Sequence, residues 1–339
     1  MPPMDPFAAD GYSLAELTAA INILPNQYGL INQLGIFRDQ GVTTRSILVE
    51  EQNGSLNLLP SLPVGSPGTV GSVGKRKLRS FSIPHIPHDD VIHPADVQGI
   101  RAFGVEDQAK TIAGAMAEKL QIMRNKHAIT LEWMRMGALK GILIDGDAST
   151  TLYNFYTEFA IVAKTVYFDF ANSDDIRASC LEVLRHIDAN LKGEIMTGVV
   201  ALVSSGFFDL LTAHDSVKDA FKYYQTNQNL AGDYRRQFVF AGITFREYVA
   251  TATTPEGTSH AFITANKGHA FPMGTSSAFA TFYAPADFNE TVNTIGLAMY
   301  AKQEPKKFGR GWDLHTQSNP FPICLRPAVL VTLDEGAGA

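Results

Sequence analysis

The chain of 339 residues has only two cysteines and no long apolar run. Cys180 and Cys324 lie far apart in apolar surroundings, which is typical of buried reduced thiols and not of a disulfide framework. No stretch of about 18 uncharged apolar residues is present, and the start lacks the basic and apolar regions of a secretory signal. We therefore expect a soluble protein of a reducing cytoplasm that has no membrane-spanning segment.

Positive charge is not in excess either. The formal net charge is −6, from 28 basic and 34 acidic residues, so a sequence-independent grip on nucleic acid by the whole surface is excluded and any contact with it must be local. A hydrophobic content of 45% excludes a disordered chain and allows a sizeable core. The length suggests two or three domains.

Catalytic signatures are also missing. The sequence has no nucleophile elbow, no Walker loop and no dinucleotide-binding glycine pattern between a strand and a helix. Ser204, Ser205, Asp209 and His214 can be combined into a triad, but any chain of this length offers such triples. The sequence therefore does not indicate a catalytic centre, and we expect no cofactor.

One cluster could suggest a metal site, because His85, His88 and His93 lie beside Asp89 and Asp90. In an extended strand, residues three apart point to opposite faces, and a second ligand pair with zinc-site spacing is absent. Prolines fix an extended path through this segment, which makes the two aspartates a solvated or partner-facing corner. A soluble metal-assisted hydrolase using His85, His88, Asp89 and His93 stays an alternative, and bound metal in the purified protein would support it.

The most prominent feature present is an extended, proline-rich ribbon, residues 79–104, that leads into a helical pattern from Val105 to Lys140. An uninterrupted helix of this length would extend about 54 Å. That is long for one globular domain and favours a chain that contacts its neighbours. Gly141 is expected to end the helix, followed by a hairpin over 142–159 with Asp145-Gly146 at the turn and an aromatic return strand.

The segment before the ribbon allows two pairings. Asn53-Gly54 predicts a local hairpin between residues 47–49 and 56–58. A glycine-rich run over 61–74 is instead typical of the tip of a longer two-stranded loop, because both of its flanks have strand character. Such a tip is expected to be ordered only by a partner.

Other elements complete an α+β pattern. Ser13 and Glu16 form a capping box for a short amphipathic helix that ends before Pro25. After residue 173, helices and strands alternate; the helices are expected over 174–191 and 206–224, and the strands over 199–204, 238–245, 245–251 and 260–264.

Three segments resemble the phage major capsid protein E family, to which the major head protein of phage lambda belongs. They are FSIPHIPHDDVIHPADVQGIRAFG (81–104), LKGILIDGDASTTLYNFYTEF (139–159) and GWDLHTQSNPFPICLRPAVLV (311–331). The resemblance implies the Hong Kong 97 phage capsid fold. Its expected parts are an N-terminal arm (1–43), an extended loop (44–95), a spine helix (96–141), a peripheral hairpin (142–172), an axial domain (173–304) and a return to the peripheral domain (305–339), whose strand pairs near the hairpin.

The implied function is structural. The resemblance implies hexamers and pentamers of the chain that tile an icosahedral shell around double-stranded DNA, assembled in the host bacterial cytoplasm and retained in the virion. It also implies a separate scaffolding protein, a portal protein, a decoration protein and non-specific contact with packaged DNA. Some relatives crosslink their subunits covalently through a lysine and an asparagine. Lys75 or Lys77 could be that lysine, but no matching motif for the asparagine is visible, so the shell is expected to be held together noncovalently. An encapsulin-type compartment is a further alternative.

Two groups of residues are predicted to matter most. The cations Lys75, Arg76, Lys77 and Arg79, together with Asp89 and Asp90, are expected in contacts between subunits, because clustered cations repel one another unless they are paired or solvated. A solvated loop face is the alternative for the cations. Trp312, Pro320, Pro322 and Pro327 are expected in the core, where they pin the C-terminal strand. Loss of a fully buried indole would cost about 3–5 kcal/mol.

Overall fold

The computed structural model describes residues 29–52, 76–98, 112–171, 175–224, 235 and 237–336. The predicted N-terminal helix, the Asn53-Gly54 turn and the glycine-rich run lie outside these residues. No helix in the described part of the chain is long and apolar enough to cross a membrane.

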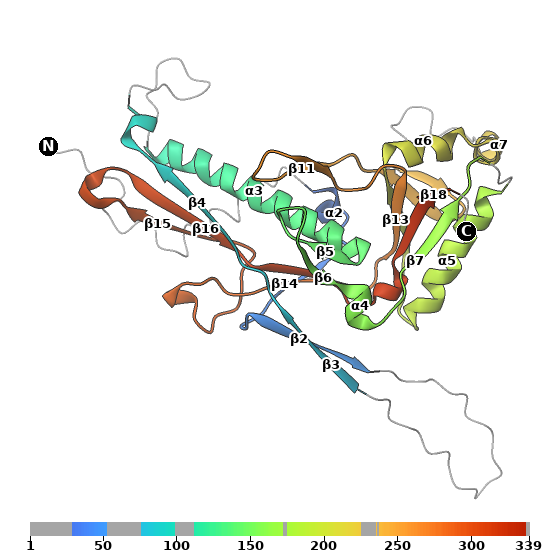
Figure 1. Ribbon diagram of the computed structural model, residues 1–339, viewed down its shortest axis with the longest axis horizontal. Coiled ribbons are helices and arrows are strands. Elements are labelled where there is room, and N and C mark those ends of the chain that lie inside the picture. The colour runs from blue at the N-terminus through green and yellow to red at the C-terminus, as the bar shows by residue number, and fades with distance from the viewer. Residues whose placement is uncertain are drawn as a thin grey trace, which may run out of the picture.

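A single long helix, α3 (Ile112–Lys140), runs along the molecule (Figure 1). Its predicted start at Val105 lies outside the described residues, but its end is as predicted. Gly141 follows with φ +80, and a Cβ at this position would lie 2.3 Å from the ring of Tyr156. Only glycine therefore fits the turn that leads out of the helix.

The first half of α3 lies beside a three-stranded antiparallel sheet of order β15-β16-β4, made of β15 (Tyr300–Pro305), β16 (Trp312–Ser318) and β4 (Ile86–Ile92). Between helix and sheet lies a small separate core of Ile92, Met116, Leu120, Met123, Met299, Ala301 and Leu314. Trp312 packs against this core but is only partly buried. The full burial on which the predicted loss of about 3–5 kcal/mol depended is therefore not met, although Trp312 does contact a core.

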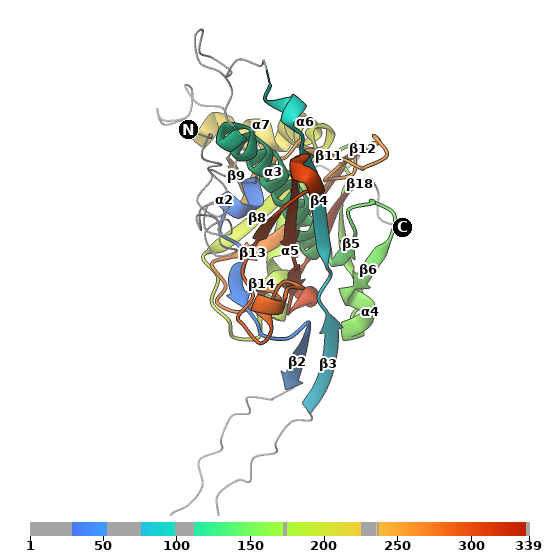
Figure 2. The same ribbon diagram turned by 90° about the vertical axis from the view of Figure 1, so that its left-hand side faces the viewer.

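The extended loop is a ribbon of β2 (Ser46–Gln52) and β3 (Arg76–Ser82), paired from Ser46 opposite Ser82 to Gln52 opposite Arg76. The ribbon projects away from the rest of the molecule (Figures 1 and 2). Because residues 47–49 pair with 79–81, the predicted local hairpin is wrong and the predicted long two-stranded loop is confirmed.

The other end of the molecule is a six-stranded mixed sheet of order β7-β18-β13-β8-β10-β9. Helices α5 (Ile176–Leu191), α6 (Ser205–Ala213) and α7 (Asp215–Tyr224) lie around this sheet (Figure 1). The strands are β7 (Lys164–Phe168), β8 (Gly198–Val203), β9 (Phe238–Phe240), β10 (Ile243–Glu247), β13 (Lys267–Met273) and β18 (Val331–Glu335). Shorter elements outside the larger sheets are α2 (Leu30–Gln33), η1 (Pro94–Asp96), β11 (Thr251–Thr253), β12 (Ser259–Ala261), η3 (Asn289–Thr291), η4 (Lys307–Gly309) and η5 (Pro327–Val329).

The sheets do not follow the predicted domain boundaries, although the division into domains itself stays a prediction. β7 and β18, expected in the peripheral domain, belong to the six-stranded sheet, where β18 pairs in parallel with β7. β14 (Phe279–Tyr283) and β15, expected in the axial domain, join other sheets: β14 pairs with β1 (Arg38–Gly41) and β17 (Pro320–Cys324). The C-terminal strands therefore do not pair with the 142–159 hairpin. Pairings between such distant segments leave no local signal in the sequence.

The hairpin itself is shorter than predicted. β5 (Ile142–Ile144) pairs with β6 (Thr151–Asn154), and the aromatic stretch that follows is a helix, α4 (Phe155–Phe159). Asn154 caps this helix by accepting hydrogen bonds from the backbone amides of Tyr156 and Thr157. The helical turn directs its aromatic rings toward the base of the extended loop.

The ribbon is anchored there by Phe81, which is fully buried. Its ring lies 5.4 Å from Tyr153, 6.2 Å from Phe159 and 5.7 Å from Phe321, between ring centroids. Phe321 comes from β17, where the buried Pro320 and Pro322 occupy an edge strand, as proline requires. Pro327 is also buried, at the start of η5. Three distant segments thus meet on one ring.

Phe81→Ala should lower the free energy of unfolding of the subunit by about 3–5 kcal/mol, because it empties the centre of the aromatic cluster. Urea unfolding would measure this loss. Leu48→Ala, in the same ribbon but 65% exposed, is the matched control and should change stability by less than about 0.5 kcal/mol. Equal losses for the two variants would contradict the anchoring role of Phe81.

Candidate assembly surface

Two of the four predicted contact cations have partners within the chain. Arg76 pairs with Glu50 across the ribbon at 3.4 Å. Arg79 donates from Nε to the carbonyl of Glu158 at 2.7 Å and lies over the ring of Phe159. Lys77 is exposed, and Lys75 lies outside the described residues. The arginines thus help to hold the ribbon, and a contact of the group with a second subunit stays a prediction.

The outward face of the ribbon carries an apolar pair. Leu48 and Leu78 are each 65% exposed. Leu48 lies opposite Ser80 and Leu78 opposite Glu50, so the two leucines are diagonal neighbours on one face. Ile47 and Phe81 point to the other face and are buried. The ribbon therefore has one face bound to its own subunit and one exposed face, on which the two leucines lie beside the Glu50–Arg76 ion pair.

The two aspartates predicted in contacts also have partners in their own chain. Asp90 accepts a hydrogen bond from Lys119 of α3 at 2.9 Å. Burial raises the pKa of Asp90, but hydrogen bonds from Lys119 and from the backbone amide of Val91 outweigh it and hold the pKa below its ordinary value. Asp89 pairs with His315 of β16 while three quarters of its side chain stays exposed. Asp90 thus ties β4 to the spine helix.

A histidine seam, formed by His88, Lys126, His127 and Thr316, joins the same three elements. The Thr316 hydroxyl donates to the carbonyl of His88 at 3.1 Å, so His127 Nε2, at 3.0 Å, is the donor to Thr316. Lys126 carries only donors, so His88 Nε2, 3.1 Å from its Nζ, is an acceptor and the His88 ring is neutral. Burial lowers the pKa of His127 to about 4, helped by His88, His315 and Lys126.

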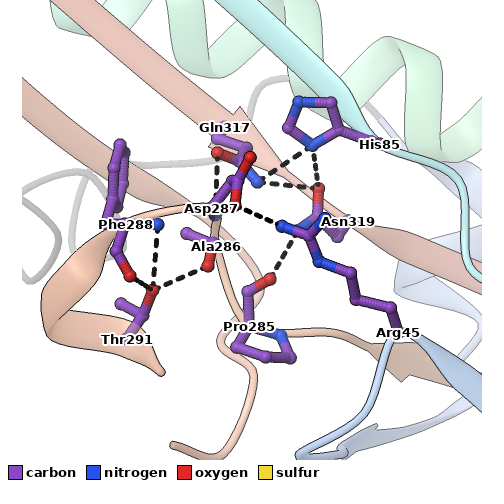
Figure 3. A network of polar contacts seen from close by, with 9 residues as sticks. All are labelled: Arg45, His85, Pro285, Ala286, Asp287, Phe288, Thr291, Gln317 and Asn319. Atoms are coloured by element: carbon purple, nitrogen blue, oxygen red, sulfur yellow. Dashed lines mark hydrogen bonds and ion pairs between the residues drawn. The ribbon is translucent and has the colours of Figure 1, made fainter. Parts of the chain in front are cut away.

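His85 belongs to a different network, drawn in Figure 3. Its Nδ1 lies 3.1 Å from Asn319 Oδ1 and 3.0 Å from Gln317 Nε2. The buried Asn319 also donates to the carbonyl of Pro285 at 2.8 Å. This network locks the chain that leaves the ribbon onto the end of β16.

The neighbouring segment holds the other strand of the ribbon (Figure 3). Arg45, just before β2, forms an ion pair with Asp287 at 2.6 Å. Thr291 stabilises the turn behind Asp287 by donating to the carbonyl of Ala286 at 2.7 Å. Both strands of the ribbon are therefore fastened at their base.

The residues of the hydrolase alternative do not converge. His85 points to Asn319, His88 to Lys126 and Asp89 to His315, while the amide of His93 binds Asp96. The described residues contain no group of three or more histidine, cysteine or acidic side chains placed to hold a metal ion. The triad considered from Ser204, Ser205, Asp209 and His214 is not formed either, because Ser204 caps α6 and His214 contacts Ser216.

Sequence reasoning missed two buried charges of α3. Glu132 accepts from the backbone amide of Ile31 and from the hydroxyl of Tyr248, both at 2.9 Å. Arg135 binds Asp39 at 2.5 Å and Asn32 at 2.9 Å. Both side chains are 3% exposed. Charges on the last apolar turns of a long helix are the signal that could have found them, because buried charges need partners.

The long helix, the projecting ribbon, the elongated sheet beside the helix and the separate mixed sheet together form the Hong Kong 97 phage capsid fold. The asymmetric unit of the mature capsid of bacteriophage PhiM1 is similar, with a TM-score of 0.54 at 14% identity over 93% of this chain and 90% of that chain. This likeness concerns the fold alone.

The sequence places the chain more narrowly. Residues 13–334 match the phage major capsid protein E family, and the chain belongs to that family. It is 31% identical to the major capsid protein of Salmonella phage Felix O1 over 94% of this chain and 95% of that protein. It is 29% identical to the major capsid protein of Pseudomonas phage KPP10 over 96% of this chain and 97% of that protein. The chain is thus a structural capsid protein and not an enzyme, and the predicted family and fold are confirmed.

The histidine seam should make subunit stability depend on pH. The pKa of His127 is lower in the folded state than its unfolded value of about 6.5, so the stabilisation is complete above pH 6.5 and is lost as the pH falls toward 4. Across that window the loss should reach about 3 kcal/mol. His127→Gln keeps a donor for Thr316 but does not titrate, so its unfolding free energy should fall less steeply. Parallel pH profiles of variant and wild type in urea unfolding would contradict this role.

Proposed function

We propose that the chain is the repeating subunit of an icosahedral phage shell, in which hexamers and pentamers enclose double-stranded DNA. The single observation that carries this proposal is the ribbon with one face fastened to its own subunit and two exposed leucines on the other, in a chain of a major capsid protein family. A two-stranded ribbon is marginally stable alone. A neighbouring subunit that packs on Leu48 and Leu78 would bury their apolar surface and so stabilise the ribbon.

A ribbon that binds a different surface of the next copy makes a heterologous contact. Contacts of this kind close into rings when the rotation between copies is a simple fraction of a turn. Each contact can be weak, because many of them act together in a closed shell. Lys77, which is exposed on the opposite face of the ribbon from Leu78, and Lys75 are suited to acidic groups of a neighbouring subunit.

The remaining expected partners belong to the same proposal. A separate scaffolding protein guides assembly in the host bacterial cytoplasm, a portal protein occupies one vertex, and a decoration protein locks the shell noncovalently. Contact with packaged DNA is non-specific, in keeping with the negative net charge. The dispersed contacts of His85, His88 and Asp89 favour neither a hydrolase nor a metal site, and the family is one of phages rather than of cellular compartments.

The double variant Leu48→Asn, Leu78→Asn should keep the stability of the isolated subunit within about 0.5 kcal/mol, because both side chains are exposed there. Its yield of closed shells should fall at least tenfold. Sucrose-gradient sedimentation and negative-stain microscopy of the expressed protein would measure the yield. Val239→Asn is the control, since Val239 is 61% exposed and lies in β9, at the edge of the six-stranded sheet and away from the ribbon. Shells at the wild-type yield from the double variant would contradict the proposed contact.

A further inference from the structure

The tip of the β15–β16 hairpin displays an aromatic ring. Phe308 is 90% exposed and lies in the short turn η4 between the two strands. Its backbone has φ 64 and ψ 20, the left-handed region. Among the described non-glycine residues with positive φ, Phe308 is the only aromatic one.

This conformation is unfavourable for a bulky residue and costs glycine nothing. The next residue, Gly309, is already a glycine with φ +66, so the turn tolerates that residue type. The ring buries little surface within its own subunit. The guanidinium of Arg310 lies 5.7 Å from its centroid. Strain that the fold does not repay indicates a role outside the subunit.

The tip is held rigidly. Lys306 donates its amide to the carbonyl of Gly311 at 2.9 Å, and Gly309 donates to Lys306 at 3.1 Å. Gly311 has φ +127, and a Cβ there would lie 2.1 Å from the carbonyl of Ile92 in β4. The small core under Trp312 supports the base of the hairpin. A contact through Phe308 therefore needs little ordering of the tip when it forms.

The charges around the ring select its partner. Lys307 and Arg310 are exposed beside Phe308, while Lys306 is paired with Asp313 at 3.2 Å. The tip is thus basic on a chain whose net charge is −6. Aromatic and arginine side chains are enriched at protein interfaces and dominate their binding energy. A ring that points outward fits an apolar hollow in a protein better than a phosphate backbone.

We propose that the Phe308 tip, residues 306–311, is an anchor that inserts into an acidic surface of a second copy of this chain. This inference rests on the proposed shell function and names a contact separate from the ribbon. Phe308 supplies the buried apolar area, and the positive charges of Lys307 and Arg310 favour a partner that, like a second copy of this chain, carries net negative charge.

The test uses the opposite effects that Phe308→Gly should have on subunit and shell. Removing the left-handed strain should raise the Tm of the isolated subunit by a few degrees. The yield of shells should nevertheless fall at least tenfold. Phe308→Tyr keeps the ring and should assemble as the wild type does. Lys192→Gly relieves the same kind of strain at an exposed helix end, with φ 49, and should raise the Tm with no loss of shells.

The outcomes separate the two proposals. If the wild type forms shells and Phe308→Gly forms them equally well, the anchor is wrong and the shell function stands. If the wild type forms no shells even when it is expressed together with the scaffolding protein of its phage, both are wrong. A photoreactive benzoylphenylalanine at position 308 in assembled shells should give adducts between two copies of this chain, identified by mass spectrometry. Adducts only to another protein or to DNA, or none, would overturn the choice of partner.

Discussion

The burial of Phe81 is the interaction on which the rest of the architecture depends. The ring sits where β3 leaves the extended ribbon. It packs on Tyr153 of β6, on Phe159 of α4 and on Phe321 of β17. A ribbon that projects from a subunit acts as a lever. Its base must therefore be held by close packing, and large rings supply much contact area with few rotatable bonds.

Polar contacts around the aromatic cluster orient the segments that the cluster joins. The pair Arg45–Asp287 and the His85–Asn319 contact fasten the two strands of the ribbon at its base. Arg135 and Glu132, buried in α3, hold the segment before the ribbon through Asp39 and Ile31. Hydrogen bonds and ion pairs are directional, so the buried contacts of Glu132, Arg135 and Asn319 restrict how the segments beside the ribbon can move, while the exposed Arg45–Asp287 pair adds little.

The subunit keeps apolar side chains exposed on both of its projecting parts, Leu48 and Leu78 on the ribbon and Phe308 on the hairpin tip. Their backbones are firmly attached, while the side chains bury little area in one subunit. This arrangement is costly for a protein that acts alone and useful for one that assembles, because burial is completed only by a neighbour.

Local signals in the sequence determined the long helix and its end at Gly141, the strands of the ribbon and the α+β class, since periodicity, glycine and proline act over a few residues. The motifs at 81–104, 139–159 and 311–331 determined the family. Only the tertiary structure decided which strands pair: β18 with β7, β14 with β1, and residues 47–49 with 79–81. It alone also decided that Trp312 is only partly buried, that Asp90 is bound to Lys119 and that Phe308 is strained. Each of these depends on segments far apart in the chain, whose meeting is set by the packing of the whole and leaves no pattern in either segment alone.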